Sequence, residues 1–272
     1  MLHEGTFSTG TVDLHHATTT DDGPPLVFLH GVMSRWQSWL HIMPAFTSRW
    51  QLHALDFRGH GESGRTPGAY RAVDYATDVI AYLRERVGQP AVIVGHSLGA
   101  IVAIAVAADA PELVRAAVLE DPPLGAFSDQ SLRERPENPR FRASFELASQ
   151  GLSRAELEAR LVGLPPEVDA ARRRFRAQNL ACLDPNVLDV LLNDRAKEGY
   201  DLDGRLGRIA APVLLLQGNE VHGGALDDGR ARHAAAALRD CAHVYFPDAG
   251  HGIKEAQPIE FGQVVNAFLE SL

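Results

Sequence analysis

The stretch of sequence that decides the fold is Ala91-Val92-Ile93-Val94-Gly95-His96-Ser97-Leu98-Gly99, which an apolar run continues to Ala108. Residues 91–94 are apolar and mostly β-branched, which predicts a buried strand. Residues 98–108 are apolar almost all round, which predicts a buried helix. Because glycines interrupt the apolar run, a strand, a turn and a helix explain it better than a membrane span.

Short apolar runs of the same kind recur along the chain and predict further strands. They cover residues 10–18, 26–29, 52–55, 116–119, 212–216 and 243–246. Helical patterns lie between them, over residues 39–46, 74–87, 228–238 and 259–272. Strands that alternate with helices predict the α/β class, with a mostly parallel central β-sheet and helices on both faces.

The alternation of strand and helix patterns stops between residues 124 and 208. Strand-like runs are missing from this part of the sequence, and helical stretches rich in Arg and Glu replace them. We interpret residues 124–208 as a helical insertion into a single α/β domain. Residues 1–123 and 209–272 then form the core domain.

Composition limits the classes of function. The chain has 272 residues and a formal net charge of −9, which argues against nucleic acid and against an anionic membrane surface as partners. Cys182 and Cys241 stand far apart, and we expect two reduced thiols. No secretory signal is recognisable at the N-terminus, so we expect a cytoplasmic location. No histidine or carboxylate cluster has metal-ligand spacing, so we expect neither a metal nor another cofactor.

The pentapeptide Gly95-His96-Ser97-Leu98-Gly99 is the strongest chemical signal in the sequence. Glycines at both ends suit a tight turn, in which a Cβ would collide with neighbouring backbone. The serine would then stand at the head of the sheet, where the N-terminus of the following helix directs N–H groups at a substrate. The strand–turn–helix context therefore predicts that Ser97 is a nucleophile.

A serine hydroxyl is a poor nucleophile at neutral pH and needs a base. His251 follows the last predicted strand, within Asp248-Ala249-Gly250-His251-Gly252. Because parallel strands end at one edge of a sheet, we expect His251 and Ser97 to meet there. His30-Gly31 ends an earlier strand at the same edge. The backbone N–H groups of Val32 and Leu98 are therefore the predicted oxyanion donors.

At this point the sequence resembles the α/β-hydrolase family over nearly its whole length. The matching pieces are His30-Gly31, the loop Asp56-Phe57-Arg58-Gly59-His60-Gly61-Glu62-Ser63, the turn at residues 95–99 and Gly250-His251. The resemblance implies an α/β-hydrolase fold in which the insertion at residues 124–208 forms a helical cap over the active site.

The resemblance leaves the acid of the catalytic triad open. Most of the family places an aspartate in a Gly-x-x-Asp turn after the strand at 213–216, but here the turn ends at Val221, with Glu220 one residue earlier. Some branches, including one group of haloalkane dehalogenases, take the acid from the end of the preceding core strand, which ends here in Glu120-Asp121. We rank Asp121 first and Glu220 second, with Asp227 and Glu120 behind them.

The predicted activity is hydrolysis of a carboxylic ester, or of a lactone or thioester, of a small and largely apolar molecule. Ser97 would form an acyl-enzyme and His251 would act as general base. Trp36 and Trp39 are candidates to line the acyl pocket. We expect a small-molecule substrate and a monomer or homodimer.

Other activities of the same fold are alternatives. Opening of halides or epoxides is disfavoured, because it uses an aspartate nucleophile where this chain has Ser97. A carbon–carbon bond hydrolase is possible but not favoured, because such relatives usually carry a Gly-rich stretch after His-Gly, where this chain has Val32-Met33-Ser34-Arg35. A cofactor-independent oxygenase is possible, since those enzymes keep a serine at this turn. A non-catalytic ligand-binding relative of the hydrolases is the third alternative.

Overall fold

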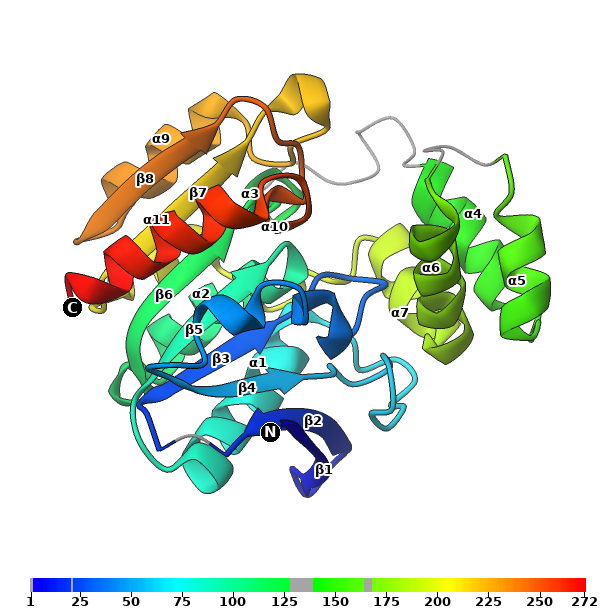
Figure 1. Ribbon diagram of the computed structural model, residues 1–272, viewed down its shortest axis with the longest axis horizontal. Helices are drawn as coiled ribbons and strands as arrows, with labels where there is room; N and C mark the ends of the chain where they lie inside the picture. The colour runs from blue at the N-terminus through cyan, green and yellow to red at the C-terminus, as the bar shows by residue number, and fades with distance from the viewer. Residues whose placement is uncertain (1, 21, 128–138, 164–167) are drawn as a thin grey trace.

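Figure 1 presents the computed structural model, which describes residues 2–20, 22–127, 139–163 and 168–272. Within these residues the strands form one eight-stranded sheet, in the order β1-β2-β4-β3-β5-β6-β7-β8. The strands are β1 (Leu2–Ser8), β2 (Asp13–Thr19), β3 (Pro25–Leu29), β4 (Gln51–Leu55), β5 (Ala91–His96), β6 (Val114–Glu120), β7 (Val213–Gly218) and β8 (Cys241–Phe246). From β4 to β8 all neighbours pair in parallel, whereas β2 pairs antiparallel with both β1 and β4.

Helices cover both faces of the sheet, which confirms the predicted α/β class. Alternate residues of a strand point to opposite faces, so Val27 and Ile93 join one apolar cluster while Phe28 and Val94 join the other. The first face carries α1 (Ala72–Tyr82) with its extension η3 (Leu83–Val87), α2 (Leu98–Asp109), α8 (Leu202–Arg208) and α9 (Asp228–Ala237). The second face carries η1 (Trp36–Trp39), η2 (Met43–Ala45), α10 (Ile253–Ala256) and α11 (Pro258–Glu270). The short turns η4 (Pro111–Leu113) and η6 (Glu220–His222) lie in loops.

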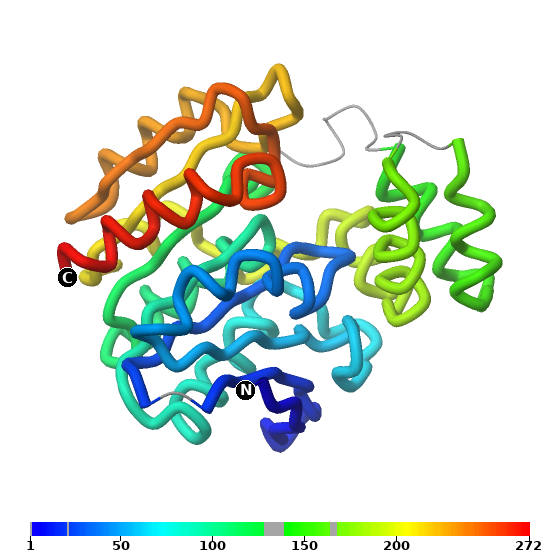
Figure 2. Tube along the Cα trace, in the orientation of Figure 1, coloured from blue at the N-terminus to red at the C-terminus, as the bar shows by residue number. Residues whose placement is uncertain are grey.

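Four helices of the predicted insertion stand beside the body of the molecule (Figures 1 and 2). They are α4 (Pro139–Ala148), α5 (Arg154–Arg160), α6 (Ala170–Cys182) and α7 (Pro185–Leu192), and we call them the cap helices. The short helix α3 (Leu124–Phe127) leads out of the sheet after β6. At the other end of the insertion α8 packs on α2 of the body, where Arg205 pairs with Asp109 at 2.8 Å. The division into a core domain and a cap at residues 124–208 stays a proposal, although α8, the last helix of that range, packs on the body.

Hydrogen bonds fasten the cap helices to the body at the junction of α6 and α7. The hydroxyl of Tyr70 donates to the Asp184 carboxylate at 2.6 Å, and the N–H of Asp184 donates to the carbonyl of Gly59 at 2.8 Å. From the other side, the Arg35 Nε donates to the Asn179 Oδ1 at 3.1 Å. The loops that follow β3 and β4 therefore hold the cap helices in place over the carboxyl edge of the sheet.

Three local expectations differ from the structure. The edge strand β1 was not predicted, because its sequence LHEGTFS is largely polar and it is mostly exposed. The helix expected over residues 39–46 is absent, and this part of the chain forms the 3-10 helices η1 (Trp36–Trp39) and η2 (Met43–Ala45) instead. The helix expected from Asp74 begins two residues earlier, and the Asp74 carboxylate instead accepts the N–H of Arg71 at 2.9 Å.

The turn between β5 and α2 is possible only with glycine at both ends. A Cβ on Gly95 would overlap the backbone of Gly99 and Ala100, and one on Gly99 would overlap the carbonyl of Leu29. Between them Ser97 has φ 55° and ψ −115°, a strained backbone conformation. The close approach of α2 to β3 therefore sets the position of Ser97.

Gly99→Ala should lower the free energy of unfolding by about 1–3 kcal/mol, because backbone rather than a flexible side chain must move to admit the methyl group. Gly207→Ala in α8 is the matched control, since a Cβ there meets no atom within 4 Å. The control should raise stability by about 0.5–1 kcal/mol. Urea unfolding of both variants measures the difference, and equal stabilities would contradict this account of the turn.

Candidate active site

Ser97 lies where β5 ends and α2 begins, at the carboxyl edge of the sheet. Its N–H donates to the carbonyl of Glu120 at 3.0 Å, which ties it to the end of the neighbouring strand β6. The residue is 6% exposed. Its hydroxyl is held close to the sheet edge and to the side chain of His251.

His251 lies in the turn between β8 and α10, and its imidazole reaches Ser97. The Ser97 hydroxyl donates to the His251 Nε2 at 2.9 Å, which requires the proton of the ring on Nδ1. The carbonyl of His251 accepts a hydrogen bond from the His96 Nε2 at 2.9 Å. Burial lowers the pKa of His96 well below its usual value, so His96 is a neutral donor that supports the turn.

Asp121 meets the other side of the imidazole. The His251 Nδ1 donates to the Asp121 Oδ2 at 2.7 Å. The carboxylate is fully buried and also accepts backbone N–H groups from the loop after β7, namely Gly218 at 3.1 Å, Ala225 at 2.7 Å and Leu226 at 3.3 Å. These donors fix both oxygens, so the carboxylate can hold the imidazole in one orientation and one tautomer.

The other candidate acids are engaged elsewhere. Glu220 lies on the exposed turn η6, and the bond of the His251 Nδ1 goes to Asp121 instead; the alternative based on Glu220 is therefore corrected. The chain turns outward after Asn219, which carries Glu220 away from the sheet edge. Asp227 caps α9 by accepting the N–H of Arg230, and Glu120 contacts Lys254 on the second face.

The predicted oxyanion donors lie beside Ser97. A Cβ on Gly31 would stand 3.2 Å from the Ser97 Cβ, so the loop that carries Val32 passes directly over the serine. Leu98 is the first residue of α2, where a backbone N–H has no acceptor within the helix. The loop after β3 and the first turn of α2 therefore lie beside Ser97.

His30 shapes the loop that carries Val32. Its Nδ1 donates to the carbonyl of Gly31 at 2.8 Å, and its Nε2 accepts the N–H of Phe57 at 3.0 Å. The ring is fully buried, and burial lowers its pKa, so it remains neutral. These contacts place His30 beneath the loop, where it supports the backbone.

Asp56 supports the same loop by contacts that the sequence did not predict. Its carboxylate accepts the N–H of Trp36 at 2.7 Å and that of Glu62 at 3.1 Å. The neighbouring Arg58 forms a two-point ion pair with Asp78 of α1, with both distances 2.6 Å. The Arg58 guanidinium is thus paired with Asp78 on α1, and the Asp56 carboxylate accepts backbone N–H groups instead.

Trp36 and Trp39 do not lie together on a substrate surface. Trp39 is fully buried, with its ring 5.0 Å from that of Phe28 and the Lys254 Nζ 4.6 Å above it. Trp36 is 3% exposed and belongs to the same apolar cluster. The expectation that these residues line the acyl pocket is therefore corrected to packing on the second face, because η1 turns both indoles into the core.

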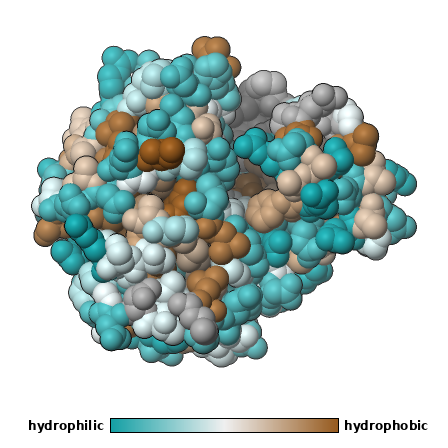
Figure 3. Space-filling view, viewed as in Figure 1, coloured by the Kyte–Doolittle hydropathy of each residue, from teal (hydrophilic) through white to brown (hydrophobic). Residues whose placement is uncertain are grey.

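Figure 3 shows a hollow in the surface between the body and the cap helices. Arg35 spans this region, with its guanidinium 5.4 Å from the ring centroid of Phe175 and its Nε on Asn179. No local pattern predicts this contact, since Arg35 and Asn179 are 144 positions apart.

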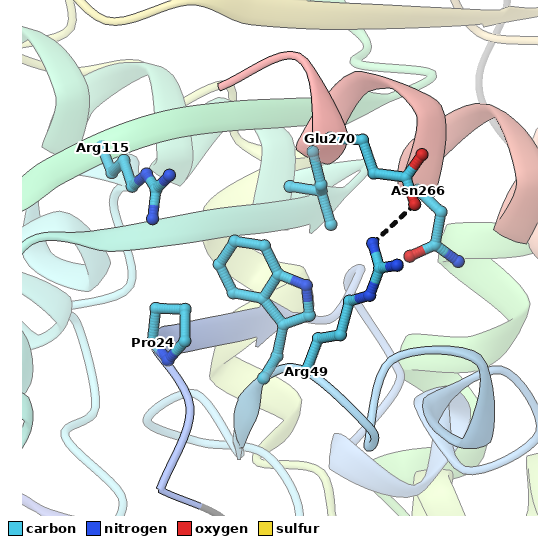
Figure 4. A pocket seen from close by; sticks show the side chains of 7 residues that line it. Pro24, Arg49, Arg115, Asn266 and Glu270 are labelled. Atoms are coloured by element: carbon cyan, nitrogen blue, oxygen red, sulfur yellow. Dashed lines mark hydrogen bonds and ion pairs between the residues drawn. The ribbon is translucent and has the colours of Figure 1, made fainter.

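A separate surface cavity of about 210 Å³ lies at the opposite edge of the sheet (Figure 4). Pro24 precedes β3 and Arg115 lies at the start of β6, while Arg49 pairs with Glu270 at 2.5 Å. Because Ser97 lies at the carboxyl ends of the strands, this cavity is not its substrate site.

Within the described ranges no group of three or more His, Cys, Asp or Glu side chains could hold a metal ion. None of the helices in the same ranges combines the length and apolar character needed to cross a membrane.

Comparison with known proteins agrees with this architecture. Residues 26–261 match the family model described as the alpha/beta hydrolase family. The chain is 35% identical to a pyrrolizixenacetamide deacetylase of Xenorhabdus hominickii, over 92% of each protein. It is 28% identical to a pimeloyl-[acyl-carrier protein] methyl ester esterase of Nitrosomonas europaea, over 90% of this chain and 96% of that protein.

A solved structure of E-2-(acetamidomethylene)succinate hydrolase superposes with a TM-score of 0.78 at 24% identity, covering 99% of this chain and all of that one. The curated relatives are hydrolases, and the family model covers most of the sheet together with the cap helices. The chain belongs to the alpha/beta hydrolase family.

Proposed function

We propose that the protein is a serine hydrolase that cleaves a carboxylic ester of a small, largely apolar substrate through an acyl-enzyme on Ser97. One observation carries this proposal: an unbroken hydrogen-bonded chain runs from the Ser97 hydroxyl through His251 to Asp121, with distances of 2.9 Å and 2.7 Å. Nucleophile, base and orienting acid in this order are the arrangement that acyl transfer to serine requires. That the relatives are hydrolases supports an enzyme.

The chemistry follows from the geometry. His251 takes the proton of Ser97 as the Oγ attacks the substrate carbonyl, and then gives it to the leaving group. Asp121 keeps the Nδ1 protonated, so that Nε2 is the basic nitrogen, and stabilises the imidazolium. Water then attacks the acyl-enzyme by the same route, and the acid product leaves.

The oxyanion of the tetrahedral intermediate would lie between the N–H groups of Val32 and Leu98. Each such donor is worth about 3 kcal/mol in the transition state of acyl transfer. His30 supports this assignment because its bond to the Gly31 carbonyl holds the first of the two loops. Val32 and Met33 pack against the apolar cluster of the first face, which favours an apolar acyl group beside them.

Replacement of the nucleophile tests the proposal directly. Ser97→Ala should lower kcat on p-nitrophenyl acetate at least about 10³-fold, because only oxyanion stabilisation and binding remain. A fluorophosphonate probe should label the wild-type protein on the peptide that contains Ser97 and should not label the variant. An alanine variant that hydrolyses the ester at the parent rate would refute the proposed role of Ser97.

Substitution of the two ranked acids tests the orienting role. Asp121→Asn should lower kcat by about 10²–10⁴-fold, because an amide favours the wrong tautomer of His251. Glu220→Gln, on its exposed turn, should leave kcat within twofold. Thermal unfolding of both variants shows that the fold is kept. If Glu220→Gln were the more damaging change, the assignment of Asp121 would be wrong.

Amide hydrolysis is a second candidate, and one observation favours it. The relative of 35% identity is named a deacetylase of an acetamide, whereas the relative of 28% identity is named a methyl ester esterase. The same three side chains suit both reactions, because His251 can protonate an amine leaving group as well as an alcohol. The distinction lies in the substrate pocket and not in the triad.

A matched pair of substrates separates the two candidates. For an ester hydrolase we expect kcat/KM on p-nitrophenyl acetate to exceed that on p-nitroacetanilide by more than about 10³-fold, since amine expulsion is the harder step. An amidase should instead turn over p-nitroacetanilide at a measurable rate that Ser97→Ala abolishes, whereas an ester hydrolase should not turn over the anilide. Lactones and thioesters complete the panel, and oxygen uptake without ester turnover would instead favour the oxygenase alternative.

A further inference from the structure

A buried ion pair lies directly beneath the catalytic residues. Lys254 is 1% exposed and Glu120 is fully buried, and the Lys254 Nζ stands 3.2 Å from the Glu120 Oε2. The Nζ also stands 3.0 Å from Glu255 and lies over the ring of Trp39. Burying two charges costs more than their attraction commonly returns, so a pair in this position calls for a reason other than stability.

Each member of this ion pair favours the charged form of the other. Burial raises the pKa of Glu120, and the ammonium of Lys254 opposes that rise. Burial alone would lower the pKa of Lys254, but the carboxylates of Glu120 and Glu255 outweigh it and the pKa is raised. Lys254 is therefore charged, and its charge stabilises the ionised form of Glu120.

The carboxylate of Glu120 also makes a contact with the backbone that leads to the base. Its Oε1 accepts the N–H of Lys254 at 2.9 Å, three residues after His251 and in the first turn of α10. The carbonyl of Glu120 accepts the N–H of Ser97, and the next residue, Asp121, binds the His251 ring. One strand end thus contacts the nucleophile, the base and the chain that carries the base.

We propose that Glu120 is a positioning residue, which fixes His251 relative to Ser97 by holding the first turn of α10 through its bond to the Lys254 N–H. The ammonium of Lys254 favours the ionised form of this acceptor within the core. The inference rests on the proposed function, because it concerns the reach of His251 to Ser97. A shift of about 1 Å in a catalytic group can cost about 10²-fold in rate, so the bond acts on kcat rather than on substrate binding.

Two double variants isolate the hydrogen bond from the charges. Glu120→Gln with Lys254→Met leaves no charge on either member of the pair but keeps an acceptor for the backbone N–H. Glu120→Leu with Lys254→Met is equally neutral and similar in size, and it has no acceptor. We expect the second to have a kcat on p-nitrophenyl acetate at least tenfold below the first, with KM values within twofold.

The single variants Glu120→Gln and Glu120→Met repeat the comparison with Lys254 in place, where Glu255 remains its counter-ion. If Glu120→Leu with Lys254→Met does not fold, the comparison of these two single variants tests the same hydrogen bond. Asp109→Asn with Arg205→Met is the control, since it removes an ion pair at the far end of α2. It should lower the melting temperature and leave kcat unchanged.

A spectroscopic measurement separates positioning from plain stability. The proton between the His251 Nδ1 and Asp121 should give a low-field NMR signal that the Gln-containing variants keep and that the Leu- or Met-containing variants lose or broaden. Equal kcat values and equal signals within each pair would overturn the proposal. Failure of the proposed function is distinguishable, because the wild-type protein would then not label with fluorophosphonate at Ser97.

Discussion

The parallel pairing of β5 with β6 is the constraint on which the candidate site depends. His96 lies opposite Glu120 in this ladder, so the chains leave the sheet at the same level, one at Ser97 and the other at Asp121. The hydrogen bond from the Ser97 N–H to the Glu120 carbonyl extends the pairing by one step beyond the strand. Backbone pairing in the centre of the sheet thus positions the proposed nucleophile and the proposed acid, whereas a loop brings in His251.

The loop between β8 and α10, which carries His251, is restrained by hydrogen bonds at several points, so its backbone has little conformational freedom. His96 binds the carbonyl of His251, and the N–H of Asn219 donates to the carbonyl of Ala249 at 2.6 Å. On the other side, the His41 Nε2 donates to the carbonyl of Lys254 at 2.9 Å. Contacts from three different parts of the chain thus restrict the segment that carries the base.

Much of this arrangement could be predicted because it depends on local sequence. The buried strands, the glycine turn around Ser97 and the late His251 each leave a pattern of apolar residues and glycines. The acid was harder to choose, since Asp121 and Glu220 both follow strands and only the loop at 218–226 decides between them. That loop supplies three N–H donors to Asp121, an arrangement with no signature in the order of side chains.

Contacts between residues far apart in the chain could not be predicted either, because they leave no local sequence pattern. The pairing of Arg58 with Asp78 and of Glu120 with Lys254 depends on how helices lie over the sheet. Trp39 could not be assigned from its position near a strand end, because a tryptophan there packs equally well toward the core or toward a substrate.

Backbone strain is concentrated where the proposed chemistry takes place. In the described part of the chain four residues other than glycine have positive φ, and three of them are Met33, Ser97 and Asp121. Such conformations cost about 1–3 kcal/mol each and persist only when the surroundings dictate them. Here the surroundings are the buried strands β3, β5 and β6, whose ends carry these residues. The stability of the sheet core therefore offsets the strain at Met33, Ser97 and Asp121, which follow these strands at the carboxyl edge of the sheet.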